Sequence, residues 1–142
     1  MNVSARNVFK GKVTALVDGA VNAEVELTLA GGDKIVAVVT EGSVNSLGLA
    51  VGKEAVAYVK APWVIVLAGD AAVKFSARNQ LGGTVDSVQK GAVNSDVSIR
   101  LAGGALVHAV ITNDALLELG LKPGVPACAL IKASHVILGV PA

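Results

Sequence analysis

The sequence predicts a mainly β fold that consists of two tandem five-stranded β-barrels, each with one short helix. Three observations lead to this prediction. An internal repeat runs through the 142 residues. Apolar residues make up 53% of the chain but aromatic residues only 3%, so the core must be built from Ala, Val, Leu and Ile. The 16 glycines and a period-two alternation favour short strands joined by tight turns.

The tetrapeptide Ser-Ala-Arg-Asn occurs at residues 4–7 and again at residues 76–79. The same offset of 72 residues aligns the rest of the chain without a gap. A gapless match of this length indicates a tandem duplication. We therefore expect two domains, 1–70 and 73–142, joined at the turn-prone stretch 69–72. The matched segments include 19–22 with 91–94, 30–32 with 102–104, 47–49 with 119–121, and 60–61 with 132–133.

The first copy shows where three strands of each half begin and end. Residues 8–16 are strand-like, and Gly11 inside them predicts a bulge or a sharp bend. A turn at Asp18-Gly19 leads into residues 22–29, which alternate between apolar and polar side chains like a half-buried strand. Residues 30–33, Ala-Gly-Gly-Asp, predict a hairpin, and residues 34–39 a third strand.

A short helix follows the third strand and is clearest in the second copy. Thr112 suits the N-cap, Asp114 lies in the first turn, and Gly120 suits the position after the last turn. The first copy, residues 40–48, forms a weaker helix because of Gly42 and Val44. Residues 55–60 and 64–67 supply two final strands. Five strands with a helix between the third and fourth describe a small OB-like barrel, and we expect each half to form one.

Charge and composition exclude several classes of protein. The net charge of +1 provides no general field for nucleic acid or an anionic membrane. Cys128 is the single cysteine, so the chain has no internal disulfide and Cys128 is expected to be a small buried residue. No apolar leader follows Met1, and the longest apolar stretch, 61–68, is too short to span a bilayer. We expect a cytoplasmic protein.

Few polar residues are identical in the two halves, and none of them is acidic. Acids match only in kind, as Glu24 and Asp96 do. Arg and Lys donate hydrogen bonds and never accept them, hydroxyls can rotate to donate, and a helix N-terminus adds free N–H groups. This set therefore points to an oxyanion site. Its members are Ser4/Ser76, Arg6/Arg78, Asn7/Asn79, Asn22/Asn94, Thr40/Thr112 and Lys60/Lys132.

A pocket that contains only donors selects among oxyanions by their protonation state. A protonated anion would bring an O–H group that finds no acceptor. Sulfate, molybdate and tungstate are bare dianions at neutral pH, whereas phosphate is partly protonated. The residues therefore favour a tetrahedral dianion.

Structural explanations for the same residues stay open at this point. Ser-Ala-Arg-Asn can be a turn with a solvated Arg, Thr40 and Thr112 can be simple caps, and the lysines can protect edge strands from aggregation. For Gly-Ala-Val-Asn the turn is the favoured explanation, with Gly19 and Gly91 at positive φ.

Other chemistries lack the residues that they need. The positions of His108 and His135 are occupied by Val36 and Trp63 in the first copy. This lack of a matching histidine argues against a role as metal ligands. No catalytic set appears at matched positions, so no enzymatic activity is expected.

Four longer motifs together resemble the Mop domain of molbindins, in its tandem two-domain form. They are Ser-Ala-Arg-Asn at the head of each repeat, Gly-Ala-Val-Asn-Ala-Glu-Val at 19–25, Gly-Gly-Asp-Lys-Ile at 31–35, and Lys-Ala-Pro-Trp-Val-Ile at 60–65. The resemblance covers essentially the whole chain. It implies OB-like barrels that assemble as a homotrimer and bind molybdate or tungstate between barrels for intracellular storage and homeostasis. It implies no organic cofactor, and metal bound only as the oxyanion.

The resemblance also implies two classes of molybdate site. The first combines the Ser-Ala-Arg motif of one barrel with the Thr, a nearby Ser and the Lys-Ala segment of its partner. The second lies near a three-fold axis and uses the Gly-Ala-Val-Asn backbone. The first class comprises Ser4, Ala5, Arg6, Thr40, Ser43, Lys60 and Ala61, then Ser76, Ala77, Arg78, Thr112, Lys132 and Ala133; the second comprises Gly19, Ala20, Val21 and Asn22, then Gly91, Ala92, Val93 and Asn94.

The two copies depart from each other and from the family pattern. Ala115 stands where the first copy has Ser43, and Lys-Ala replaces the Lys-Ser of many relatives in both copies. The sites are therefore expected to differ in affinity.

Two alternative functions remain. An OB-fold nucleic-acid binder would need stacking aromatics and a basic groove, and the chain offers few aromatics and little net charge. A molybdate-sensing regulatory module would need a separate partner, because no DNA-binding helices or nucleotide motif are present.

Overall fold

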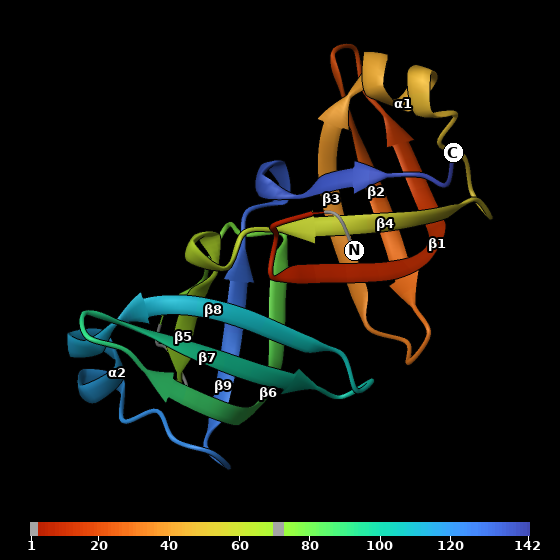
Figure 1. Ribbon diagram of the computed structural model, residues 1–142. Coiled ribbons are helices and arrows are strands. Elements are labelled where there is room, and N and C mark those ends of the chain that lie inside the picture. Colours follow the sequence, from red (N-terminus) through yellow and green to blue (C-terminus); the bar gives the residue numbers. More distant parts are fainter. Residues whose placement is uncertain (1–2, 70–72) are drawn as a thin grey trace.

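Two five-stranded antiparallel sheets, each with one short helix, make up the protein (Figure 1). The computed structural model describes residues 3–69 and 73–142. The first half contains β1 (Asn7–Asp18), β2 (Asn22–Leu29), β3 (Lys34–Thr40), α1 (Glu41–Leu47), β4 (Glu54–Val59), the 3-10 turn η1 (Ala61–Trp63) and β5 (Ile65–Ala68). The second half contains β6 (Asn79–Lys90), β7 (Asn94–Leu101), β8 (Leu106–Thr112), α2 (Asn113–Leu119), β9 (Pro126–Ile131), the 3-10 turn η2 (Ala133–His135) and β10 (Ile137–Gly139).

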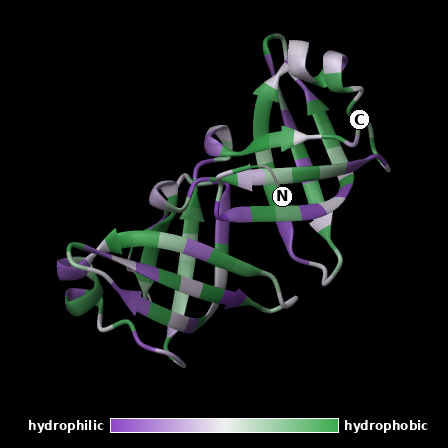
Figure 2. Ribbon diagram, in the orientation of Figure 1, coloured by the Kyte–Doolittle hydropathy of each residue, from purple (hydrophilic) through white to green (hydrophobic). Residues whose placement is uncertain are grey.

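The alternation predicted for residues 22–29 is confirmed in β2. In β2 the residues Ala23, Val25 and Leu27 are buried, and the polar residues that follow each of them are half-buried. Figure 2 shows the same alternation of hydrophobic and hydrophilic residues along the strands of both halves. The buried side chains are almost all aliphatic, as the low aromatic content requires. No helix in the described part of the chain is long and apolar enough to cross a membrane.

The helix caps also agree with the sequence. The Thr40 hydroxyl accepts a hydrogen bond from the Ser43 amide at 3.1 Å, and Thr112 does the same for Ala115 at 3.1 Å. Gly48 and Gly120 end the two helices in the left-handed conformation, at φ 63° and 62°. The first copy forms its helix despite Gly42, because the caps at both ends are the same as in the second copy.

The bulge in β1 lies elsewhere than predicted. The register against β2 shifts between Val13 and Ala15, whereas the sequence placed the bulge or bend at Gly11. Gly11 instead allows a close approach, since a Cβ there would lie 2.5 Å from the Thr28 carbonyl oxygen. A glycine within a strand can indicate a close approach of two backbones as well as a β-bulge. In β1 these two features lie at different residues.

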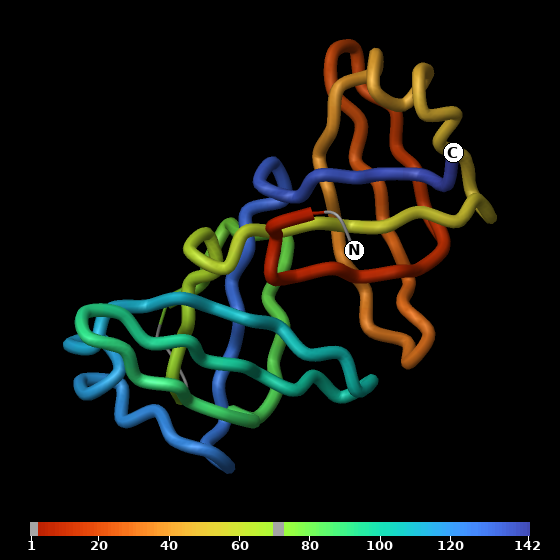
Figure 3. The backbone as a smooth tube through the Cα atoms, viewed as in Figure 1, coloured from red at the N-terminus to blue at the C-terminus, as the bar shows by residue number. Residues whose placement is uncertain are grey.

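The expectation that each half forms its own barrel needs correction, because the halves exchange their last strands. The sheet orders are β10-β4-β1-β2-β3 and β5-β9-β6-β7-β8. Figure 3 shows the blue C-terminal segment crossing to the first half and the yellow-green β5 segment crossing to the second. Ile137 pairs with Tyr58 and Ile65 pairs with Leu130, which are equivalent positions. Because the two strands are equivalent, local sequence could not distinguish exchange from pairing within one half.

Two buried asparagines join the halves a second time. Asn79, 2% exposed, accepts from the Val36 amide at 2.7 Å and donates to the Val36 carbonyl at 2.8 Å. Asn7, 1% exposed, makes the same pair of bonds to the backbone of His108, at 2.6 and 2.8 Å. Each asparagine is the fourth residue of a Ser-Ala-Arg-Asn motif, and its side chain satisfies backbone groups of an edge strand in the opposite sheet.

Replacing Asn79 by Ala should destabilise the protein by about 1–3 kcal/mol, because the buried backbone groups of Val36 lose their partner. Urea unfolding measures the change. Asn45→Ala, which removes an exposed amide from α1, is the matched control and should leave the stability nearly unchanged. Equal unfolding midpoints for the two variants would contradict a bridging role for Asn79.

Candidate functional site

Three donor residues of the second copy, Ser76, Arg78 and Lys132, lie around one hollow of about 520 Å³. Residues 76–78 precede β6, and residues 132–134 follow β9. Asn79 of β6 pairs with Ile131 of β9, so these two flanking segments leave the sheet side by side. The hollow is lined by Ser76, Ala77, Arg78, Lys132, Ala133 and Ser134, with apolar residues that include Val38 of the first half.

The threonine and serine of the first copy lie in a second, smaller hollow of about 300 Å³. Asn22, Thr40 and Ser43 line it, together with Ser134 of the other half. The two hollows share Val38 and Ser134, so they adjoin. The Thr40 and Ser43 hydroxyls are 2.9 Å apart.

Strand exchange explains why residues from different halves meet. The 3-10 turn η2 leads into β10, which joins the first sheet, and η2 therefore packs against β3 beside Thr40. In the same way η1 packs against β8, the strand that ends at Thr112. The Lys-Ala segment of each half thus lies beside the threonine of the other half.

Both arginines are paired with acids, which the sequence analysis did not foresee. Arg78 binds the Glu24 carboxylate through two nitrogens at 2.6 Å each, and Arg6 lies 2.6 Å from Asp96. Each pair joins opposite halves, and each guanidinium remains about half exposed. Glu24 and Asp96 match in charge although not in residue type, so a comparison of identical polar residues did not include them. The bidentate pair occupies two of the five N–H groups of Arg78 and leaves three for other acceptors.

The lysines have a different environment from the arginines. No salt bridge within residues 3–69 and 73–142 includes Lys60 or Lys132. The Lys60 ammonium lies 5.4 Å from the centre of the Trp63 ring, and Trp63 contacts His135, its equivalent in the second copy, at 5.0 Å between ring centres. Lys132 therefore supplies a positive charge that no carboxylate of the described chain neutralises.

The Gly-Ala-Val-Asn turns differ from expectation in their backbone. Neither Gly19 nor Gly91 has positive φ. Each is required for space: a Cβ on Gly19 would lie 2.5 Å from the Asn22 carbonyl oxygen, and one on Gly91 would lie 2.7 Å from that of Asn94. The glycine amides donate to the same oxygens at 2.9 and 2.8 Å, so these two N–H groups are already used.

The surroundings of the two turns have opposite charge. Asp18 and Glu41 flank the first turn, and a hydrogen bond with Asp18, partial burial and repulsion from Asp18 together raise the pKa of Glu41. The equivalent residues beside the second turn are Lys90 and Asn113. The Asn113 side chain donates to the Gly91 carbonyl at 3.0 Å.

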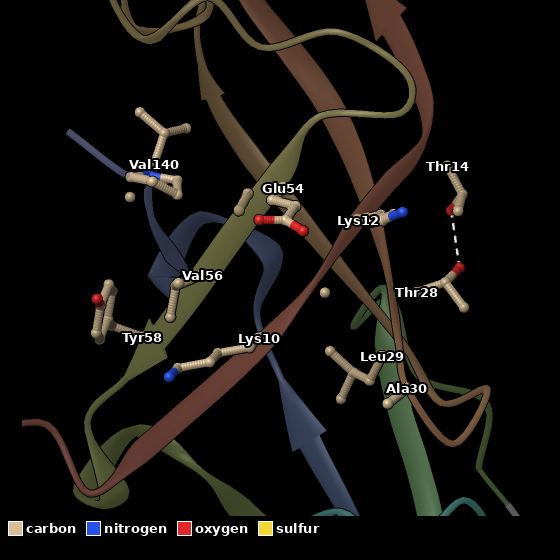
Figure 4. A pocket seen from close by; sticks show the side chains of 14 residues that line it. Lys10, Lys12, Thr14, Thr28, Leu29, Ala30, Glu54, Val56, Tyr58 and Val140 are labelled. Carbon is tan, nitrogen blue, oxygen red and sulfur yellow. Dashed lines mark hydrogen bonds between the residues drawn. The ribbon is translucent and has the colours of Figure 1, made fainter.

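A further hollow, of about 800 Å³, lies on the outer face of the first sheet and contains none of the predicted residues. Figure 4 shows Lys10 and Lys12 on β1, Glu54 and Tyr58 on β4, and Val140 beyond β10. The lysines have no counterparts in the second copy, so comparison of the repeats could not identify this surface.

Ser134 is the lining residue that the sequence analysis missed. It directly follows Lys132-Ala133, but the equivalent residue of the first copy is Pro62. A search for identical polar residues in the two copies therefore excluded it. In the described ranges, no group of three or more His, Cys, Asp or Glu side chains could hold a metal ion.

Comparison with known proteins supports an oxyanion site. The TOBE domain family profile matches residues 3–66 and 76–138. A crystal structure of the cytoplasmic molybdate-binding protein ModG with molybdate bound has a TM-score of 0.94 and 57% identity, covering 99% of this chain and all of that one.

Two curated relatives match at different lengths. The molybdenum-pterin-binding protein MopA of Rhodobacter capsulatus is 46% identical over 141 residues, which are 99% of this chain and 53% of MopA. The molybdenum-pterin-binding protein 2 of Clostridium pasteurianum is 48% identical over 68 residues, all of that protein and 48% of this chain. The chain thus spans about half the length of MopA and is about twice as long as the clostridial protein.

Glu41→Gln should raise the melting temperature at pH 8 more than at pH 4. A raised pKa means that ionised Glu41 is disfavoured in the folded state, and this penalty grows as the pH rises from the ordinary glutamate pKa through the raised value. Glu118→Gln in α2 is the control, because no salt bridge among the described residues involves that exposed carboxylate. A Glu41→Gln effect of equal size at both pH values would contradict the carboxyl pair.

Proposed function

We propose, because this chain belongs to the TOBE domain family, that it is a non-enzymatic protein that binds molybdate between its two repeats. The observation that carries the proposal is the likeness to ModG, a protein with molybdate bound, at 57% identity over essentially the whole length. Identity this high over a shared fold supports the same ligand class. The donor-rich hollows at the junction of the halves supply suitable chemistry.

Two sites of the first class are proposed, and each draws on both halves. One combines Thr40 and Ser43 with residues 76–78 and 132–134, and we refer to it as the Ser134 site. The other combines Thr112 and Ala115 with residues 4–6 and 60–62 and is referred to as the Pro62 site. In each proposed site, the Thr of one half lies beside the Lys-Ala segment of the other half, and both contribute to binding of the anion.

The arginine and the lysine of the Ser134 site have separate roles. Arg78 forms a nearly neutral pair with Glu24, which fixes the guanidinium and leaves spare N–H donors for an oxyanion. Lys132, unpaired within the described chain, supplies the net positive charge. Hydroxyl groups complete a donor set that suits a bare tetrahedral dianion. Tungstate has the same charge and shape as molybdate and is proposed to bind as well.

A homotrimer is the proposed assembly. Several aliphatic side chains are largely exposed, among them Val21 (72%), Val93 (71%) and Ile65 (65%). Val21 and Val93 lie in the Gly-Ala-Val-Asn turns, which are the proposed second class of site. Contact between copies at these turns would cover the apolar side chains and bring several backbone segments to one anion.

Storage and homeostasis of molybdenum inside the cell is the proposed role. ModG is described as a cytoplasmic protein, and we propose the same compartment for this chain. The domains 1–70 and 73–142 remain a proposal for the units of duplication, although each sheet takes one strand from the other unit. Residues 70–72 of the proposed joint lie outside the described residues.

Titration calorimetry with molybdate, tungstate, sulfate and phosphate tests the function, with the mass of the assembly measured in parallel. Molybdate and tungstate should bind and phosphate should bind most weakly. Lys132→Met should lower the affinity for molybdate about 10- to 100-fold, since a hydrogen bond to a charged group contributes about 1.5–3 kcal/mol. Lys122→Met, at an exposed site before β9, should have no effect. Absence of molybdate binding by the unmodified protein would refute the proposal.

The second class of site should favour the turn at 91–94 over the turn at 19–22, because Lys90 attracts a dianion and the Asp18–Glu41 pair repels it. Lys90→Asp combined with Asn113→Glu should remove one class of bound molybdate, measured by equilibrium dialysis. The reciprocal variant, Asp18→Lys with Glu41→Asn, should add binding at the first turn. Unchanged stoichiometry in both variants would contradict this preference.

A further inference from the structure

The two 3-10 turns that carry the Lys-Ala segments have the same backbone shape. Lys60 and Lys132, which precede them, have φ/ψ of −69°/133° and −66°/128°. Val64 and Val136, which follow them, have −87°/123° and −87°/125°. Any difference between the two turns as ligand sites therefore comes from their side chains and from the donors that each residue provides.

The second residue of each turn differs in its capacity to donate. Ser134 is exposed and lines both adjoining hollows, so it lies where residues 76–78 and Lys132 meet Thr40 and Ser43. It carries a hydroxyl and a backbone N–H. Pro62, its equivalent, has neither a hydroxyl nor a backbone N–H.

A second difference adds to the first. The Ser43 hydroxyl lies 2.9 Å from the Thr40 hydroxyl in the Ser134 site. Ala115 occupies the equivalent position beside Thr112 and has no polar side-chain atom. The Pro62 site therefore has up to three fewer donors than the Ser134 site, while Arg, Lys and the first Ser are the same in both.

We infer that the two inter-repeat sites are unequal and that Ser134 is the residue that determines the difference. The Ser134 site takes up a tetrahedral dianion first, and the Pro62 site fills only at molybdate concentrations at least ten times higher. This inference rests on the proposed function. A donor lost from the environment of a charged ligand weakens binding about ten-fold or more, and the anion finds no compensating donor at Pro62.

The graded loss of donors has a functional consequence. A store with two equal sites per chain releases its anion over a narrow range of free concentration. Two unequal sites widen this range, so that one molecule both retains a reserve and exchanges molybdate with the surrounding solution.

The test compares substitutions at the two equivalent positions, with molybdate as the ligand. Ser134→Ala should weaken the tight class of sites about ten-fold and leave the weak class unchanged. Pro62→Ser should strengthen the weak class about ten-fold. Pro62→Ala restores the backbone N–H without the hydroxyl, and its affinity should lie between those of the unmodified protein and Pro62→Ser. Thr84→Ala, which removes an exposed hydroxyl from β6, is the control and should change neither class.

Calorimetry gives the affinities, and anomalous diffraction from crystals grown with one molybdate per chain identifies the site that fills first. Molybdenum concentrated at the Ser134 site is the expected result. Equal occupancy of both sites, or unchanged affinities in Ser134→Ala and Pro62→Ser variants that retain the unmodified melting temperature, would overturn the inference. Such results would leave the proposed function intact, whereas a protein that binds no molybdate at all would refute the function itself.

Discussion

Neither sheet of this protein is complete without the other half, and most of the architecture depends on this constraint. β10 supplies the edge strand of the first sheet and β5 that of the second. Asn7 and Asn79 then hydrogen-bond the backbone at the opposite edges, so that buried polar groups are satisfied only when both halves are folded. The result is a fixed relation between the two repeats, obtained with few aromatic residues and no disulfide among the described residues.

The same constraint assembles the candidate sites. Each crossing strand follows a 3-10 turn, so the Lys-Ala segment of one half is held against the threonine of the other. The arginines are oriented in turn by carboxylates across the junction, at 2.6 Å. Rigid donors from two directions favour binding of a small anion, because little conformational freedom is lost when the ligand arrives. An isolated repeat would have the same residues without this arrangement.

Duplication within one chain also provides an internal comparison of what each position does. Residues that serve the junction, such as Asn7 and Asn79, are identical in the two copies, and the arginine partners Glu24 and Asp96 keep their charge. Most donors of the proposed site are also identical in the two copies, but Ser134 and Pro62 differ, and so do the surroundings of the two turns. The junction tolerates little change because buried polar groups need their partners, whereas a site can lose a donor and still bind more weakly.

Local features of the fold followed from the sequence alone: the duplication, the alternation in β2, the hairpin at 30–33 and the threonine and glycine caps of both helices. Each depends on contacts within a few residues, which composition and spacing encode. Most donor residues, although not Ser134, could be found by comparing the two copies, and the family resemblance gave the ligand class. The tertiary structure decided the position of the β1 bulge, the roles of Gly19 and Gly91, the acid partners of the arginines and the exchange of β5 with β10. These depend on which distant segment lies opposite. Two repeats with the same order of strands give the same local pattern for either pairing partner, so only the folded chain determines which partner is used.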